Sequence, residues 1–124
     1  MLERVLLVAA AGAVGSILRY LVSGLVVDWV GPSTWGTFVV NITGAVMLGF
    51  LVGVTEERWL APYYVRTALA IGLLGAYTTF STLMFETVDL AESRSFVAAG
   101  ANVLGSVTAG LMAVYAGLVV GRTV

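Results

Sequence analysis

Four long apolar stretches limit most strongly what this chain can fold into. They cover residues 5–27, 34–54, 62–88 and 96–120, and short polar connectors separate them. A helix of about 20 apolar residues crosses the bilayer's hydrocarbon core, which is about 30 Å thick. We therefore predict an all-α membrane protein with four transmembrane helices, in which residues 1–124 form one transmembrane domain.

The composition leaves little room for a soluble fold or for enzyme chemistry. Hydrophobic residues make up 60% of the 124 residues and charged residues only 10%, too little polar surface for a soluble domain. The net charge of −1 and the absence of lysine argue against a nucleic-acid partner. Because the chain has no cysteine and no histidine, thiolate, imidazole and zinc chemistry are excluded, and we expect no enzymatic activity.

An even number of spans places both chain ends on the same side of the membrane. Arg4, Arg58, Arg66 and Arg122 lie toward that side. Arg94 lies toward the other, and Arg19 is a candidate for the same side as Arg94. The positive-inside rule therefore favours cytoplasmic termini in a cell membrane. The bias is modest, because Arg58 stands beside two glutamates and Arg66 falls within the third apolar stretch, so insertion in both orientations stays open.

The third span contains the least ordinary stretch of the chain. Residues 72–86, GLLGAYTTFSTLMFE, combine two glycines with the hydroxyls of Thr78, Thr79, Ser81 and Thr82. Every polar group in hydrocarbon must find a partner, so this interruption indicates a broken helix that faces protein, water or an ion. We predict a break in the third helix and a conduit or binding site beside it.

Isolated polar residues occur in the other three spans. Arg19 in the first is either an interfacial arginine that snorkels or a deep cation that meets a carboxylate, a carbonyl or an anion. Asn41 in the second is either an interhelical clamp or a donor that lines a path. In the fourth, Asn102 and Ser106 are one turn apart, so they share a face and extend a polar stripe.

Small residues recur at helical spacing, for example at Gly49 and Gly53 and at Gly117 and Gly121. This pattern is typical of close helix packing. A tight four-helix bundle has little space at its centre. We therefore expect a conduit to form between subunits rather than inside one.

Three motifs together resemble the CrcB/Fluc family of fluoride channels. They are GTFVVNITG at residues 36–44, the run from Gly12 to Tyr20, and residues 72–86. The resemblance covers the whole chain in span layout and motif order, and TTFST at residues 78–82 is its most specific part.

The resemblance implies a dual-topology dimer of antiparallel subunits, embedded in membrane lipid, that exports cytoplasmic fluoride passively. It also implies a structural sodium ion at the centre, held by backbone carbonyls that match Gly75 and Thr78. A broken helix frees carbonyl groups, and sodium prefers oxygen ligands. The expected partners are the fluoride ion and a second copy of the chain, with a heterodimer as the alternative.

The same resemblance assigns roles on the ion pathway. Asn41 matches the pore asparagine, Phe80 the first pore phenylalanine, and Arg19 an arginine that draws anions to the entrance. Amide and hydroxyl donors and positive ring edges suit a small, strongly hydrated anion. With the polar stripe added, the expected pathway residues are Arg19, Asn41, Phe80, Ser81, Thr82, Leu83, Asn102 and Ser106.

The chain departs from the family pattern at three positions. Leu83 replaces the second phenylalanine, Ala76 replaces the second glycine of a pair, and Asn102 stands where many relatives have a tyrosine. These changes leave open an aliphatic pore wall or a different partner subunit. Two functions other than a fluoride channel are also compatible with four short spans. A small multidrug-type exporter needs a carboxylate in the first span, where this chain has Arg19, and a non-transporting assembly protein leaves TTFST without a role.

Overall fold

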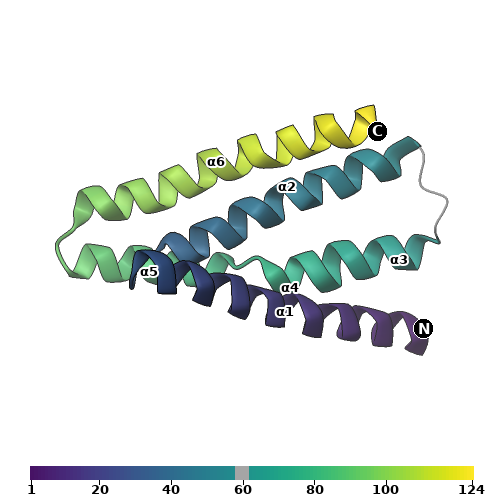
Figure 1. The fold of residues 1–124 in the computed structure, drawn as a ribbon, viewed down its shortest axis with the longest axis horizontal. Coiled ribbons are helices and arrows are strands. Elements are labelled where there is room, and N and C mark those ends of the chain that lie inside the picture. Colours follow the sequence, from purple (N-terminus) through teal and green to yellow (C-terminus); the bar gives the residue numbers. More distant parts are fainter. Residues whose placement is uncertain (58–61) are drawn as a thin grey trace.

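The computed structural model describes residues 1–57 and 62–124, and these residues form helices and connectors without any strand (Figure 1). Arg58, one of the arginines counted above, lies outside the described residues. The elements are α1 (Leu2–Val30), α2 (Trp35–Glu57), α3 (Tyr63–Thr67), the π-helix η1 (Ala68–Leu74), α4 (Gly75–Tyr77), α5 (Phe80–Glu92) and α6 (Phe96–Thr123).

The prediction of four membrane spans is confirmed. Each of the segments Leu2–Val30, Trp35–Glu56, Tyr63–Glu92 and Phe96–Thr123 is long and apolar enough to cross a bilayer. All four helical segments extend beyond the C-terminal end of the predicted apolar stretch, and the first also begins before its N-terminal end. Helical hydrogen bonding continues through polar residues such as Glu3, Asp28 and Glu92 once the chain has left the hydrocarbon core.

The helices form two neighbouring pairs. Figure 1 shows α2 beside α6 and α1 beside the third span, with the N- and C-termini at the same end of the bundle. The connector from α5 to α6 lies at the opposite end. The members of each pair therefore run in the same direction.

Glycines bring α2 and α6 into backbone contact. A Cβ atom at Gly49 would overlap the carbonyl oxygen of Val114, and one at Gly117 would overlap that of Val46. The two motifs are Gly49 with Gly53 and Gly117 with Gly121, both at a spacing of four residues. This confirms the expected packing through small residues, which in a bilayer replaces the hydrophobic driving force by close van der Waals contact.

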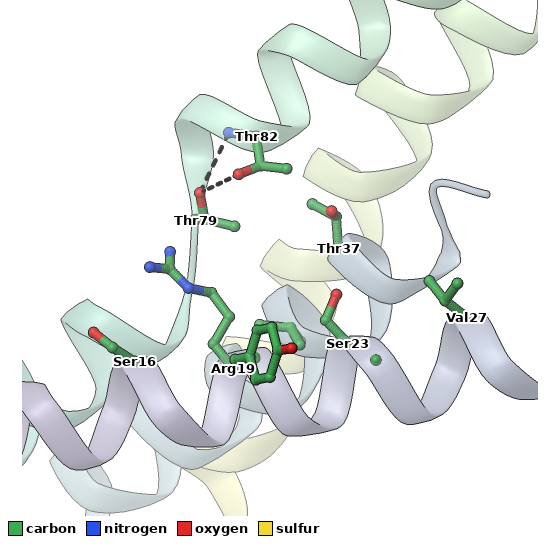
Figure 2. Close-up of a pocket in the computed structure, with 10 residues that line it drawn as sticks. Ser16, Arg19, Ser23, Val27, Thr37, Thr79 and Thr82 are labelled. Atoms are coloured by element: carbon green, nitrogen blue, oxygen red, sulfur yellow. Dashed lines mark hydrogen bonds between the residues drawn. The ribbon is translucent and has the colours of Figure 1, made fainter. Parts of the chain in front are cut away.

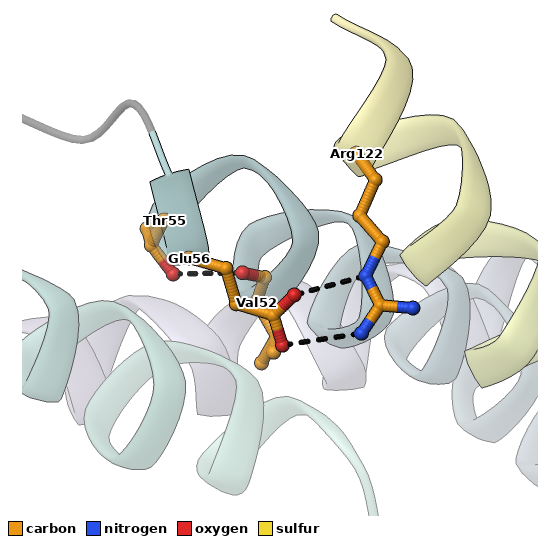
Figure 3. Close-up of polar contacts among 4 residues, drawn as sticks. All are labelled: Val52, Thr55, Glu56 and Arg122. Atoms are coloured by element: carbon orange, nitrogen blue, oxygen red, sulfur yellow. Dashed lines mark hydrogen bonds and ion pairs between the residues drawn. The ribbon is translucent and has the colours of Figure 1, made fainter.

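An ion pair joins the far ends of the same two helices. Arg122 Nε lies 2.9 Å from Glu56 Oε2, and Arg122 Nη2 lies 3.4 Å from Glu56 Oε1 (Figure 3). The side chains are 50% and 39% exposed, respectively, so we assign the pair a contribution of at most about 1 kcal/mol. Buried glycine contacts, rather than this pair, hold α2 against α6.

The third span packs against α1 through close backbone contact, as α2 does against α6. Its helix is then interrupted by two extended residues. Gly72 faces Val8. A Cβ atom added at Gly72 would lie 2.8 Å from the carbonyl oxygen of Val8. The π-helical hydrogen bonding of η1 was not predicted from the sequence. After α4, Thr78 (φ −82°, ψ 158°) and Thr79 (φ −147°, ψ 115°) have extended backbones, and α5 begins at Phe80.

Candidate functional site

The extended residues Thr78 and Thr79 organise the polar groups of the bundle. The Thr79 hydroxyl caps α5 by accepting a hydrogen bond from the Thr82 amide at 3.3 Å. It also lies 3.0 Å from the Thr82 hydroxyl and 3.4 Å from the Ser81 hydroxyl. Helix initiation after an extended threonine therefore gathers three of the four hydroxyls of the TTFST motif.

Asn41 fastens the extended backbone to α2. Its Oδ1 accepts a hydrogen bond from the Thr79 amide at 2.7 Å, and its Nδ2 donates to the Thr79 carbonyl at 3.0 Å. The Thr79 backbone cannot bond within a regular helix, and Thr79 is only 9% exposed, so these two bonds satisfy groups that water does not reach. The geometry is that of an interhelical clamp, and the role of Asn41 on an ion path stays a prediction.

A groove of about 470 Å³ lies between α1, α2 and the start of α5 (Figure 2). We call it the hydroxyl groove. It is lined by Ser16, Arg19, Tyr20, Ser23, Gly24, Val27, Thr37, Val40, Thr79 and Thr82. These side chains supply a guanidinium group and six hydroxyls, and none of them is a carboxylate. The Thr37 hydroxyl donates to Glu86, which is not a lining residue, so the guanidinium group and the other five hydroxyls are the groups that favour an anion.

Arg19 belongs to this groove and reaches toward the extended residues. Its Nη1 lies 3.5 Å from the Thr78 carbonyl oxygen, which is a long hydrogen bond, and Figure 2 shows the guanidinium turned toward Thr79. Arg19 therefore lies at a freed carbonyl, which is one of the partners expected for a deep arginine.

A second groove, of about 310 Å³, is also lined by the extended residues, and we call it the Phe80 groove. It brings together five predicted site residues: Asn41, Gly75, Thr78, Phe80 and Leu83. Phe80 is 72% exposed, whereas Leu83 is 6% exposed. Phe80 therefore projects outward from the subunit, and Leu83 packs inside it.

The predicted sodium ligands can be tested against this geometry. Gly75 and Thr78 line the same groove, and the extended backbone at Thr78 frees its carbonyl from helical bonding. A carbonyl oxygen has two lone pairs, so the long contact with Arg19 leaves one of them available. Carbonyl oxygens are ligands that a hard cation such as sodium prefers, but one subunit offers too few for a complete shell, so the sodium site stays a prediction.

Asn102 and Ser106 lie away from the extended residues. Asn102 Nδ2 donates to the Thr87 hydroxyl at 3.0 Å, and that hydroxyl donates to the Leu83 carbonyl at 2.7 Å. Ser106 is 7% exposed, and its hydroxyl has no hydrogen-bond partner among the described residues. Their place on a polar stripe stays a prediction, because the structure brings neither into the two grooves above.

Thr37, for which the sequence indicated no role, makes a short hydrogen bond to the third span. Its hydroxyl donates to Glu86 Oε1 at 2.6 Å, while Glu86 Oε2 is buried without a partner among the described residues. Thr37 lies one helical turn before Asn41, and both contact the segment from Thr79 to Glu86. That spacing of four residues on α2 was the signal that could have identified it.

Comparison with known proteins places this chain in a family. The family model described as "CrcB-like protein, Camphor Resistance (CrcB)" matches residues 6–118. The chain belongs to the CrcB family. CrcB relatives that bear the name "Fluoride-specific ion channel FluC" include proteins of Nitrobacter winogradskyi, Magnetococcus marinus and Solidesulfovibrio magneticus.

These CrcB relatives match along nearly the whole chain. The Nitrobacter protein is 40% identical over 121 residues, covering 97% of this chain and 96% of the relative. The Magnetococcus protein is 41% identical over 118 residues, covering 94% and 96%. The Solidesulfovibrio protein is 42% identical over 125 residues, covering 100% of both. Ion channels are not enzymes, and with four spans this CrcB chain is a multi-pass membrane protein.

Proposed function

We propose that this CrcB chain is a fluoride channel that lets the ion leave the cytoplasm down its gradient. The observation that carries the proposal is the surroundings of Thr78 and Thr79. Among the residues lining the hydroxyl groove and the Phe80 groove are an arginine, hydroxyls, an amide and an exposed aromatic ring, but no carboxylate. The relatives' names add fluoride as the anion.

These groups suit the energetics of fluoride transfer. A small anion gives up a strongly bound hydration shell, so neutral hydrogen-bond donors must approach it closely. The hydroxyls of Ser81 and Thr82 and the edge of the Phe80 ring, which carries a partial positive charge, can do so without binding the ion too tightly. Arg19 supplies a full positive charge at the hydroxyl groove, where it raises the local anion concentration.

Passive transport follows from acid chemistry. Hydrogen fluoride crosses a bilayer as a neutral acid and dissociates in a less acidic cytoplasm, which traps the anion inside. A selective leak for the anion then empties the cell without an energy source. The sequence contains no phosphate-binding loop of the kind that nucleotide-driven transporters use.

The proposal includes two antiparallel copies of the chain. In one copy, Phe80 is 72% exposed and its neighbour Ser81 is also exposed, although a hydroxyl that faces lipid has no partner outside its own helix. A second copy would cover both side chains. The carbonyls of Gly75 and Thr78 from the two copies would then hold a sodium ion, which would supply a fixed positive charge that joins the subunits.

Fluoride efflux from liposomes containing only this protein tests the function. In sodium buffer we expect fast fluoride efflux, no chloride efflux, and loss of fluoride efflux with Phe80→Ala. Phe96→Ala is a matched control, because Phe96 is 69% exposed but lines none of the described grooves. Absent fluoride efflux from folded wild-type protein would contradict a homomeric channel, and restored efflux with a second subunit type would favour the heteromeric alternative.

A further inference from the structure

Tyr77 is the last residue of α4 and stands directly before the two extended residues. It lines neither the hydroxyl groove nor the Phe80 groove. Its side chain is only 5% exposed, although it carries a hydroxyl group inside a membrane span. A buried tyrosine hydroxyl in a bilayer needs a hydrogen-bond partner within the protein. That partner is the Thr43 hydroxyl of α2, and the two oxygens lie 2.8 Å apart.

The other contacts of Thr43 decide which hydroxyl donates. Thr43 Oγ1 lies 2.7 Å from the carbonyl oxygen of Val39 and 3.2 Å from that of Val40. A carbonyl oxygen only accepts, and a threonine hydroxyl has one proton, so Thr43 donates that proton within α2. Tyr77 is therefore the donor and Thr43 the acceptor. The hydrogen bond ties the end of α4 to a hydroxyl that is itself fixed on the backbone of α2.

Gly44 allows this part of the third span to lie close to α2. A Cβ atom at Gly44 would overlap Cγ2 of Thr78 and would lie 3.1 Å from Cδ1 of the Tyr77 ring. The ring is therefore packed against the backbone of α2, which restricts its rotation. The hydroxyl group of Tyr77 thus has a fixed position from which it donates to Thr43.

This hydrogen bond and the Asn41 clamp hold Thr78 from both sides. Asn41 binds the backbone of Thr79, the residue that follows it. Thr43 binds the side chain of Tyr77, the residue that precedes it. In a trans peptide the carbonyl oxygen and the amide hydrogen point in opposite directions, so the Thr78 carbonyl points away from Asn41. Asn41 sets the direction of this carbonyl, whereas Tyr77 sets where the chain enters the extended segment.

We propose that Tyr77 is a positioning residue that fixes the location of the Thr78 carbonyl oxygen and thereby sets the affinity of the protein for sodium. This inference rests on the sodium site of the proposed function, in which that carbonyl is a ligand. Ligand oxygens that are already in place bind an ion more tightly, because less freedom is lost on binding. A hydrogen bond that served the fold alone would change stability and leave the sodium affinity unaltered.

The Thr78 carbonyl can be observed by itself, because Thr78 and Thr79 form the only Thr–Thr pair in the sequence. Protein labelled with carbon-13 at threonine carbonyls and nitrogen-15 at threonine amides gives one carbonyl–amide correlation in an NMR spectrum, from this peptide bond. Sodium chloride is titrated against N-methylglucamine chloride at constant ionic strength. We expect a saturable shift of the correlation in the wild type, and a half-saturating sodium concentration about tenfold higher in Tyr77→Phe.

Matched variants separate the hydrogen bond from the packing of the ring. Tyr77→Phe keeps the ring against Gly44 and removes only the donor. Thr43→Val removes the acceptor and should raise the half-saturating concentration by a similar factor, whereas Thr43→Ser keeps the hydroxyl and should retain the wild-type value. Tyr115→Phe, at a 67% exposed position on α6, is the control and should have no effect. Size exclusion and circular dichroism establish folding, and Thr43→Val keeps the test valid if Tyr77→Phe does not fold.

The correlation reports sodium binding without any fluoride flux, so the positioning role and the channel function are tested separately. A wild type that responds to sodium, with the same half-saturating concentration in Tyr77→Phe and Thr43→Val, would overturn the positioning role alone. An equal rise in Tyr115→Phe would overturn it as well. A wild-type correlation that does not respond to sodium would overturn the sodium site and the positioning role together, whatever the fluoride efflux.

Discussion

At the scale of single residues, the polar side chains of this chain act in pairs that are distant in sequence. Asn41 and Thr79 are separated by 38 residues, and Thr37 and Glu86 by 49. In each case, a side chain of α2 satisfies a polar group of the third span that the membrane would leave unpaired. Buried polar groups here fix the position of the interrupted helix, and the ion path that we propose depends on that position.

Replacement of Asn41 tests this positioning. Asn41→Ala removes both bonds to the Thr79 backbone, so we expect a loss of about 1–3 kcal/mol of stability and faster hydrogen exchange at the Thr79 amide. Thr108→Ala, an exposed position on α6, is the control and should change neither quantity. Unchanged Thr79 exchange in Asn41→Ala would show that the clamp does not hold the extended backbone.

Leu83 illustrates how a departure from the family pattern is accommodated. Because Leu83 is 6% exposed, Leu83→Phe adds volume to a packed interior, and we expect a loss of about 1–3 kcal/mol in a denaturation experiment. Leu83→Met conserves the volume and should cost less than about 1.5 kcal/mol. Equal stabilities for Leu83→Phe and wild type would mean that the side chain has open space beside it.

At the scale of helices, close backbone contact replaces hydrophobic burial as the main attraction. Gly49 and Gly117 each face a carbonyl oxygen of the opposite helix, and Gly72 lies against the backbone of α1. In a bilayer, lipid tails compete equally for apolar side chains, so helices associate through surfaces that fit closely. The π-helix η1 takes part in this contact with α1 through Gly72.

Two glycines of α6 provide a matched test of this view. Gly117→Ala would place its Cβ against the Val46 carbonyl, so we expect α2 and α6 to separate at a cost of about 1–3 kcal/mol. At Gly110 a Cβ would meet nothing within 4 Å, so Gly110→Ala should be neutral or slightly stabilising. Thermal unfolding followed by circular dichroism compares the two, and equal midpoints would argue against glycine packing between α2 and α6.

At the scale of the whole molecule, four spans place both termini at one end of the bundle and the connector from α5 to α6 at the other. The small arginine difference between the two ends gives the membrane little reason to prefer one orientation. This agrees with the antiparallel dimer that we propose, because such a dimer needs both orientations of one sequence.

Cysteine labelling tests the orientation directly, since the native chain contains no cysteine. Thr123→Cys and Ser95→Cys place exposed thiols at opposite ends of the bundle. In sealed vesicles, dual topology predicts that a membrane-impermeant maleimide labels about half of the thiols in each variant. Nearly complete labelling of one variant and almost none of the other would establish a single orientation.

The sequence by itself determined the membrane class, the four spans and the concentration of polar groups within residues 72–86. Hydropathy accumulates over neighbouring residues, so a contiguous stretch carries this information. Only the tertiary structure decided that Asn41 clamps Thr79, that Leu83 is buried, and that Arg19 lines the hydroxyl groove whereas Asn102 does not. Those outcomes depend on which helix faces come together, and that is settled by the energy of packing and hydrogen bonding between residues far apart in the chain.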